Sequence, residues 1–312
     1  MISVLLGVIP LYTFELETGG PAVMVWTWII IGPMTLLVVA SLGEICSAYP
    51  TMGAWYFWAF RLGGKEWGGF ASWIAAWCNL LGQIAGVASG GFAGAQVLAE
   101  IINLCSGTMI TKIGVVGLYG ILLIVAGIVN TFAETLLTAL CYISVAWQIV
   151  GTIVIVIAML MTAPKLQTVK FVFTEFNNDT NFQSVGYVCL IGALFAASTF
   201  TGYDTAAHVA EETTDSHQST PRAMMWSIYN AIVLGLILII GMNFCIQDIG
   251  SLVGAGDDDG SGTNQAYTIL WQQTVGTHGA IGFLFITLVA IECSNCANLA
   301  SAARMLYRFT LK

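Results

Sequence analysis

The sequence predicts an all-α membrane protein, a polytopic bundle of transmembrane helices. Of its 312 residues, 57% are hydrophobic and only 8% are charged, and the mean hydropathy is +0.84. Soluble globular proteins carry roughly 25% charged residues, so lipid must cover much of this surface. The apolar stretches between charged residues exceed the roughly 20 residues that a spanning helix needs. The sequence lacks the alternating segments of about ten residues that are typical of a membrane β-barrel.

The charged residues divide the chain into eight expected spans within one transmembrane domain over 1–312. Backbone groups in lipid must hydrogen-bond to one another, so each span is expected to be helical. The expected spans are, in chain order, about 1–17, 22–48, 70–104, 114–132, 136–162, 185–212, 223–247 and 279–309. The chain begins and ends within apolar stretches, and we therefore expect a sequence truncated at both ends.

Lysine and arginine indicate the orientation. With a cytoplasmic N-terminus, more basic residues lie inside (Arg61, Lys65, Arg222, Arg304, Arg308 and Lys312) than outside (Lys112, Lys165 and Lys170). This positive-inside bias predicts that the N-terminus lies in the cytoplasm. The expected location of this multi-pass protein is the plasma membrane or that of a vacuole or another organelle. The sequon Asn178-Asp179-Thr180 then lies outside, which makes Asn178 a candidate for N-glycosylation.

The first span is expected to be broken. It reads "LLGVIPLYTF" and contains Gly7 and Pro10. Proline has no backbone N–H and clashes with the preceding turn, so it disrupts a helix about one turn upstream. The first span is therefore expected to consist of two shorter pieces.

The sixth span has a second interruption. The apolar run "VGYVCLIGALFAASTF" leads into "TGYD", and "TAAHVAEE" then resumes a helical pattern. An ionisable side chain such as Asp204 is costly inside a membrane and indicates a functional site. In the structural alternative, the helix ends at Thr201 and Asp204 caps a cytoplasmic helix. Two broken spans in corresponding places favour an inverted-repeat transporter that binds its substrate at the breaks. Backbone N–H groups left free at the breaks would suit a carboxylate of the substrate. Asp204 and the freed backbone carbonyls would suit an ammonium group.

Polar residues also occur within the third and eighth spans. Asn79 and Gln83 share a face of the third, where Gly82, Gly86, Gly90 and Gly94 form a stripe that favours close helix packing. The two amides either bond to a neighbouring helix or line a cavity. Glu292, Asn295 and Asn298 share a face of the eighth, where the glutamate either binds a proton or cation or hydrogen-bonds a neighbouring helix. Metal-binding motifs such as H-E-x-x-H are missing from the sequence, so neither an enzyme nor a metal site is expected.

Several longer stretches resemble a known family. "SLGEICSAYPTMGAWYFWAFRLGG" followed by "ASWIAAWCNLLGQIAGVASGGFAGAQ" resembles the second and third spans of the amino acid/choline transporter family. "FTGYDTAAHVAEETTDSHQSTPRA" resembles its sixth span and following loop, and "ANLASAARMLYRF" resembles the end of its eighth. This family belongs to the amino acid–polyamine–organocation superfamily and includes fungal GABA and choline permeases and plant bidirectional amino acid transporters. The resemblance implies a LeuT-like inverted-repeat fold of about twelve spans, of which this chain carries the first eight.

The resemblance also implies roles for individual residues. It makes Leu6, Gly7, Val8 and Ile9 the unwound part of the first span and places the unwound part of the sixth at 198–204. Phe200 or Tyr203 would be the aromatic gate, and Glu44 and Arg61 would help lock the inward side. The expected substrate-binding residues are Leu6, Gly7, Val8, Ile9, Asn79, Gln83, Ser198, Phe200, Thr201, Gly202, Tyr203, Asp204, Glu292 and Asn295.

The expected function is secondary active transport by alternating access. The substrate would be an amino acid or a related amine such as GABA, choline or a polyamine-like compound, and the alternative is a transporter-fold receptor that binds such ligands without flux. No cofactor is expected beyond a coupling ion, either H⁺ or Na⁺. The expected partners are this small-molecule substrate and the lipid bilayer, and nucleic acid is not expected to bind.

Overall fold

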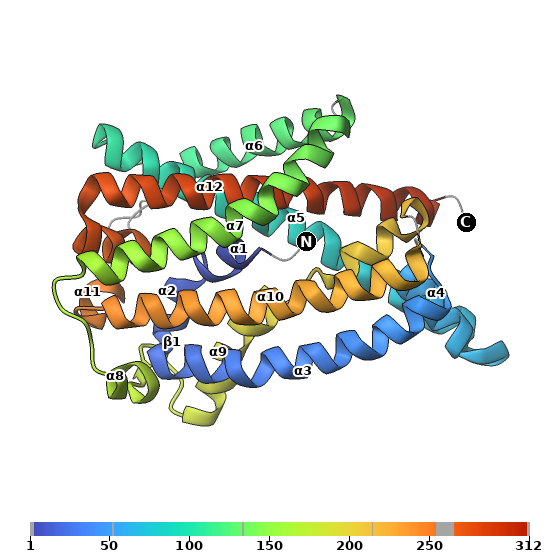
Figure 1. The fold of residues 1–312 in the computed structure, drawn as a ribbon, viewed down its shortest axis with the longest axis horizontal. Coiled ribbons are helices and arrows are strands. Elements are labelled where there is room, and N and C mark those ends of the chain that lie inside the picture. The colour runs from blue at the N-terminus through green and yellow to red at the C-terminus, as the bar shows by residue number, and fades with distance from the viewer. Residues whose placement is uncertain (1–2, 52, 133, 214, 254–264, 311–312) are drawn as a thin grey trace.

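The protein is an elongated helical bundle whose long helices run in roughly the same direction (Figure 1). The computed structural model describes residues 3–51, 53–132, 134–213, 215–253 and 265–310. Its helices are α1 Val4–Val8, α2 Tyr12–Glu17, α3 Gly20–Ala48, α4 Ala54–Leu62, α5 Gly64–Ser106, α6 Lys112–Phe132, α7 Glu134–Thr162, α8 Val169–Thr174, α9 Val185–Thr199, the 3-10 helix η1 Tyr203–Glu212, α10 Ser216–Cys245, α11 Ile249–Val253 and α12 Ala266–Thr310. The predicted all-α class is confirmed.

Seven helices in the described part of the chain are long and apolar enough to cross a membrane. They cover Gly20–Ala48, Gly64–Ser106, Lys112–Phe132, Ala139–Thr162, Val185–Glu211, Ser216–Cys245 and Ala266–Tyr307. The remaining expected span, about 1–17, consists of the short helices α1 and α2 with a break between them. Both short helices have buried side chains, so they belong to the interior of the bundle although neither is long enough to span it.

The break in the first span lies later than the sequence indicated. Leu6 to Val8 belong to α1, which ends at Val8, and its C-cap Ile9 directly precedes Pro10. Because proline cannot donate a backbone hydrogen bond, the chain turns over residues 9–11 before α2 begins at Tyr12. The expectation that Leu6, Gly7 and Val8 are unwound is therefore wrong.

The last long segment, α12, consists of two helices that meet at Gly276, whose φ of 76° and ψ of 175° are not helical. Glycine adopts this backbone conformation without the steric penalty of a side chain. The first helix begins at Ala266, before the expected span, and the second begins directly after Gly276, close to the expected start at about 279.

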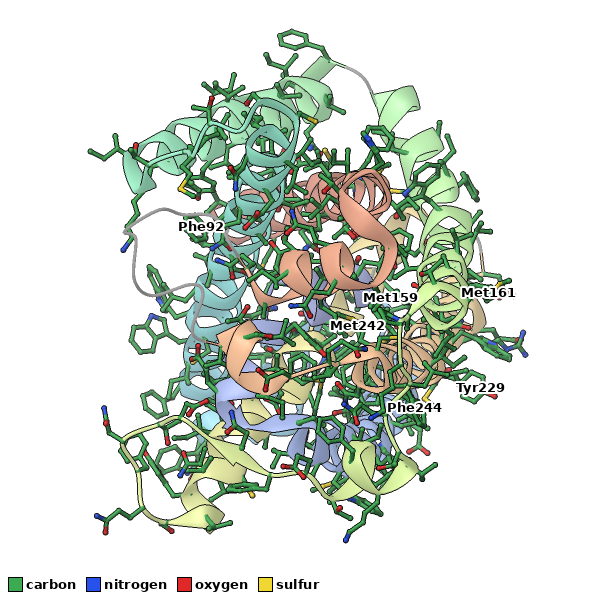
Figure 2. All side chains as sticks on the ribbon, turned by 90° about the vertical axis from the view of Figure 1, so that its left-hand side faces the viewer. Phe92, Met159, Met161, Tyr229, Met242 and Phe244 are labelled. Atoms are coloured by element: carbon green, nitrogen blue, oxygen red, sulfur yellow. The ribbon has the colours of Figure 1, made fainter. Side chains whose placement is uncertain are left out.

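Large apolar side chains fill the centre of the bundle. Met159 of α7 and Met242 of α10 are fully buried, whereas Met161 and Tyr229 lie on its outer surface (Figure 2). Trp28 of α3 is also buried, and its indole N–H donates to the carbonyl of Ile232 at 3.0 Å. This bond satisfies the polar end of a large apolar side chain, which allows it to pack inside the bundle.

A short antiparallel β-ladder closes one end of the bundle. Strand β1, Thr18–Gly19, pairs with β2, Asn177–Asn178, and α8 and α11 lie at the same end (Figure 1). Helix α4 and the C-terminus lie at the opposite end (Figure 1). The two ends of the bundle thus differ in structure. The two helix breaks lie between α1 and α2 and between α9 and η1.

Candidate substrate cavity

A cavity of about 800 Å³ lies between the two interrupted spans and helix α5. Its walls come mainly from α1, α5, α9 and η1, with single residues from α4 and α12. The lining residues are Ser3, Leu6, Gly7, Pro10, Leu11, Trp55, Ala75, Cys78, Asn79, Gly82, Gln83, Ala85, Gly86, Ser89, Gly90, Ala93, Ser198, Thr199, Thr201, Gly202, Tyr203, Asp204, Thr205 and Asn298. Its volume suits a small molecule, because ligand pockets commonly measure about 300–1,000 Å³.

The break in the sixth span depends on a glycine. Helix α9 ends at Thr199, and Gly202 has a φ of 89°, in the left-handed region. Residues with a Cβ adopt this region at an energetic cost, whereas glycine does not. The chain then continues from Tyr203 as η1, so Ser198 and Thr199 end one helix while Tyr203 and Asp204 begin the next.

Gly7 brings the first broken span against the sixth. A Cβ at Gly7 would overlap the side-chain methyl group of Thr199 and lie 2.6 Å from its hydroxyl oxygen. Thr199 is itself buried, and its hydroxyl donates to the carbonyl of Phe195 at 2.9 Å. Only a residue without a side chain fits here, so the two interrupted helices touch at one wall of the cavity.

Asp204 is the centre of a polar network at the cavity wall. Its Oδ2 accepts hydrogen bonds from the indole of Trp55 at 3.0 Å and from the amide of Gln83 at 3.4 Å. The Nε2 atom of His208 lies 3.6 Å from the same oxygen, and the amide nitrogen of Asn79 lies 3.4 Å from that Nε2. This network joins η1 to α4 and α5, and it orients the carboxylate beside the cavity.

The network leaves Asp204 able to bind a cation. A carboxylate has about four lone-pair positions on two oxygens, and the side chains of Trp55, Gln83 and His208 all approach the single oxygen Oδ2. The rest of the cavity is lined largely by glycine, alanine, leucine and small hydroxyl residues, which supply no other acidic side chain. A ligand with an ammonium group and a compact body therefore fits this arrangement.

Many of the expected site residues line the cavity together. They are Leu6, Gly7, Asn79, Gln83, Ser198, Thr201, Gly202, Tyr203 and Asp204. Val8 and Ile9 do not line it and are instead buried in the apolar core. Phe200 is also buried, with its ring centroid 4.5 Å from that of Trp28, so it packs against α3 rather than at the cavity. Of the two aromatic candidates, only Tyr203 faces the cavity.

Glu292 and Asn295 lie outside the cavity lining, behind the glycines of α5. A methyl group at Gly94 would overlap the Glu292 carboxylate, and one at Gly90 would lie 3.0 Å from Asn295 Oδ1. Asn298, one turn further along α12, does line the cavity. The glycines of the α5 stripe therefore have different surroundings. Gly90 packs against α12, whereas a Cβ at Gly82 would meet open space.

Glu44 and Arg61 are exposed side chains near α4, and they do not form an ion pair in the described part of the chain. The guanidinium of Arg61 lies 5.7 Å from the ring centroid of Tyr49 and 5.5 Å from that of Phe57. These distances allow cation–π attraction. Arg61 is therefore held by aromatic rings at the α4 end of the bundle.

Asn178 lies in β2, at the end of the bundle opposite α4 (Figure 1). Its Oδ1 accepts from the Thr180 hydroxyl at 2.6 Å, and its Nδ2 donates to the Phe182 carbonyl at 2.9 Å.

Sequence reasoning overlooked one residue of the site, Trp55. Trp55 belongs to the stretch that resembles the second and third spans of the family, and no local pattern shows that its indole reaches Asp204.

Comparison with known proteins extends over nearly the whole chain. A family profile described as "Amino acid permease" matches residues 1–310. The chain belongs to the amino acid permease family. The permease fold and the seven apolar helices make it an integral, multi-pass membrane protein, and its family is one of transporters rather than enzymes.

Individual relatives come from plants and fungi. The permease chain is 35% identical to "Amino-acid permease BAT1 homolog" of Oryza sativa subsp. japonica, over 99% of this chain and 62% of the relative. It is 32% identical to "Amino-acid permease BAT1" of Arabidopsis thaliana, again over 99% and 62%. "Amino-acid permease 2" of Neurospora crassa is 30% identical over 90% of this chain and 52% of the relative. The chain thus spans between half and two thirds of the length of these relatives.

Proposed function

We propose that this permease is a secondary active transporter of amino acids or related amines. The observation that carries the proposal is the position of Asp204, a carboxylate at the wall of a cavity between two interrupted spans. Interrupted helices near the membrane midplane are where transporters of this kind bind substrate. The names of the plant and fungal relatives agree with an amino acid as the transported molecule.

The substrate ammonium would bind beside Asp204, and its carboxylate would lie against the backbone at Gly202, where η1 begins, with Gly7 also in the cavity wall. Both glycines line the cavity, where a substrate approaches the backbone without an intervening side chain. GABA fits the same two charges, separated by a longer chain. Choline, which has no N–H to donate, would rely on the rings of Trp55 and Tyr203, which lie 6.5 Å apart between centroids.

Two hydrogen-bond networks at different depths of the bundle would break in turn during transport. On the α4 side of the cavity, Asp204 is bonded to Trp55 and Gln83. Towards the other end, Ala266 N–H donates to the Thr13 hydroxyl at 3.2 Å, and Gln265 N–H donates to Glu100 at 2.9 Å. The first network joins η1 to α4 and α5, and the second joins α2 to the start of α12 and to α5. Breaking one while the other holds would expose the cavity to one side at a time.

We also propose that the α4 end faces the cytoplasm, consistent with the basic residues Arg61 and Lys65 at that end. Asn178 then faces the opposite side and is available for glycosylation. The membrane would be the plasma membrane or that of a vacuole or another organelle.

The test is uptake into liposomes that contain the purified protein from its complete reading frame. A panel of radiolabelled amino acids, GABA, choline and polyamines would define the substrate. Asp204→Ala is expected to abolish uptake while membrane insertion and yield stay unchanged, and Asp248→Asn, an exposed substitution that preserves a helix-capping side chain, is the control. Substrate binding without flux by the unmodified protein would instead support a receptor, and normal uptake kinetics in Asp204→Ala would refute the role of this carboxylate.

A further inference from the structure

A second polar site lies where α12 crosses α5, behind the wall of the cavity. Glu292 and Asn295 are three residues apart on α12 and point at the glycine-rich face of α5. A side chain at Gly94 would overlap the Glu292 carboxylate, and a Cβ at Gly91 would lie 3.3 Å from the Asn295 amide nitrogen. The glycine backbone therefore leaves the space that these two polar side chains occupy.

Three buried polar atoms of this site, Oε1 of Glu292 and the two amide atoms of Asn295, have no hydrogen-bond partner in the described part of the chain. Asn295 is fully buried, and neither its Oδ1 nor its Nδ2 makes a hydrogen bond. Glu292 Oε1 is also buried without a partner, and no ion pair of Glu292 occurs among the described residues. A buried polar group without a partner destabilises the fold, and an ionised carboxylate does so more strongly. Such a site persists most readily when it has a ligand.

No ion pair links a positively charged side chain to Glu292 among the described residues. The titratable side chains nearby are the thiols of Cys293 and Cys296 on α12 and of Cys141 on α7, and Arg304 of α12 acts on Cys141. From α6, the phenol ring of Tyr119 packs against Gly91. From α5, the facing residues are glycines, which carry no charge. A proton from water would neutralise the Glu292 carboxylate directly.

The site adjoins the substrate cavity. Gly90 lines the cavity and also packs against Asn295. Asn298, one turn after Asn295, lines the cavity as well. A polar face of α12 thus leads from the cavity through Asn298 and Asn295 to Glu292.

The donor set fits a proton rather than a metal ion. Hard metal cations take about six oxygen ligands in proteins. The two side chains here offer only a carboxylate and one amide oxygen, and no group of three or more acidic, histidine or cysteine side chains suited to a metal occurs among the described residues. A single proton would neutralise the carboxylate and turn it into a hydrogen-bond donor.

We propose that Glu292 is the proton-binding carboxyl that couples this permease to a proton gradient. The inference rests on the proposed transport function. The Glu292 carboxylate accepts a proton from cavity water on the side of lower pH, forming one O–H bond, and returns it to water on the other side. Asn295 orients the carboxyl, and no oxidation or other reactant is involved. Intramembrane carboxyl groups serve as proton relays in many transporters.

The experiment compares net uptake with exchange in proteoliposomes from the complete reading frame. A gradient of one pH unit supports an accumulation of at most about tenfold when one proton moves with each substrate. We expect Glu292→Gln to lower this accumulation ratio to about one while exchange of labelled for unlabelled substrate continues without a gradient. Glu66→Gln, which neutralises an exposed glutamate at the start of α5, is the matched control and is expected to accumulate substrate normally.

A second readout keeps the proposal testable if Glu292→Gln is poorly produced. Proton uptake would be recorded with a pH-sensitive dye while substrate enters liposomes of the unmodified protein and of Gly94→Ala, whose methyl group displaces the carboxylate. Fewer protons per substrate in Gly94→Ala would support the proposal. Proton-driven accumulation that persists in Glu292→Gln, loss of exchange together with accumulation, or accumulation that depends on Na⁺ would each overturn it. If the unmodified protein shows no exchange, the transport proposal itself has failed.

Discussion

The contact between Gly7 and Thr199 makes a quantitative prediction about the junction of the two broken spans. In Gly7→Ala the new methyl group would overlap the Thr199 methyl and lie 2.7 Å from the Thr199 Cβ. Thr199 cannot simply rotate away, because its hydroxyl is bonded to Phe195 and the side chain is buried. Overpacking of this kind typically costs about 1–3 kcal/mol. We expect Gly7→Ala to lower stability by that amount and to lower substrate affinity, since both residues line the cavity.

The assay is a double-mutant cycle measured by thermal unfolding in detergent and by substrate binding. Each kcal/mol shifts the midpoint by about 2–4 °C for chains of about 150–250 residues, so Gly7→Ala should melt several degrees lower. Thr199→Gly in the Gly7→Ala background should recover part of this loss, and the cycle isolates the coupling between the two positions. Gly117→Ala in α6 is the control, because a Cβ there meets open space and Gly117 does not line the cavity. Equal effects of Gly7→Ala and Gly117→Ala, or no coupling with Thr199, would refute the contact.

Three further substitutions test other parts of the structure. Trp55→Phe keeps an aromatic ring but removes the hydrogen bond to Asp204. We expect it to lower the free energy of unfolding by about 1.5–3 kcal/mol, as for hydrogen bonds to charged groups. An unchanged melting midpoint would contradict that bond. Phe200→Ala should lower the free energy of unfolding by about 3–5 kcal/mol, because the ring is buried against Trp28. An unchanged melting midpoint of the purified variant would contradict this packing. Asn178→Gln should remove one glycan, seen as faster migration on a gel, whereas equal migration of both proteins would contradict the proposed orientation.

The fold class could be predicted from the sequence because membrane insertion imposes a strong constraint on composition. Long charge-free segments indicate helices directly, and the confirmed all-α class follows from them. The interruption at Gly202 could be predicted as well, because glycine and aspartate are poor choices inside a spanning helix. Asn79 and Gln83 stand out for the same reason, and the structure brings both to the cavity with Asp204.

The remaining features depend on tertiary contacts that no local pattern reports. Proline indicates that a helix is disrupted but not at which residue, so the first break lies around Ile9 rather than at Leu6. Phe200 and Tyr203 are both aromatic residues near a break, and only the packing of α9 on α3 decides which one faces the cavity. Trp55 was overlooked because its partner, Asp204, is 149 residues away in the chain.

The most direct test of the proposed site compares the binding of an amino acid with that of its analogue lacking the amino group. The two ligands would be measured against the unmodified protein and against Asp204→Asn, which keeps the shape of the side chain but removes its charge. A hydrogen bond to a charged group contributes about 1.5–3 kcal/mol, equivalent to roughly a 10- to 150-fold preference for the amino acid. We predict this preference in the unmodified protein and its loss in Asp204→Asn. An equal preference in both proteins would contradict the binding of the substrate ammonium by Asp204.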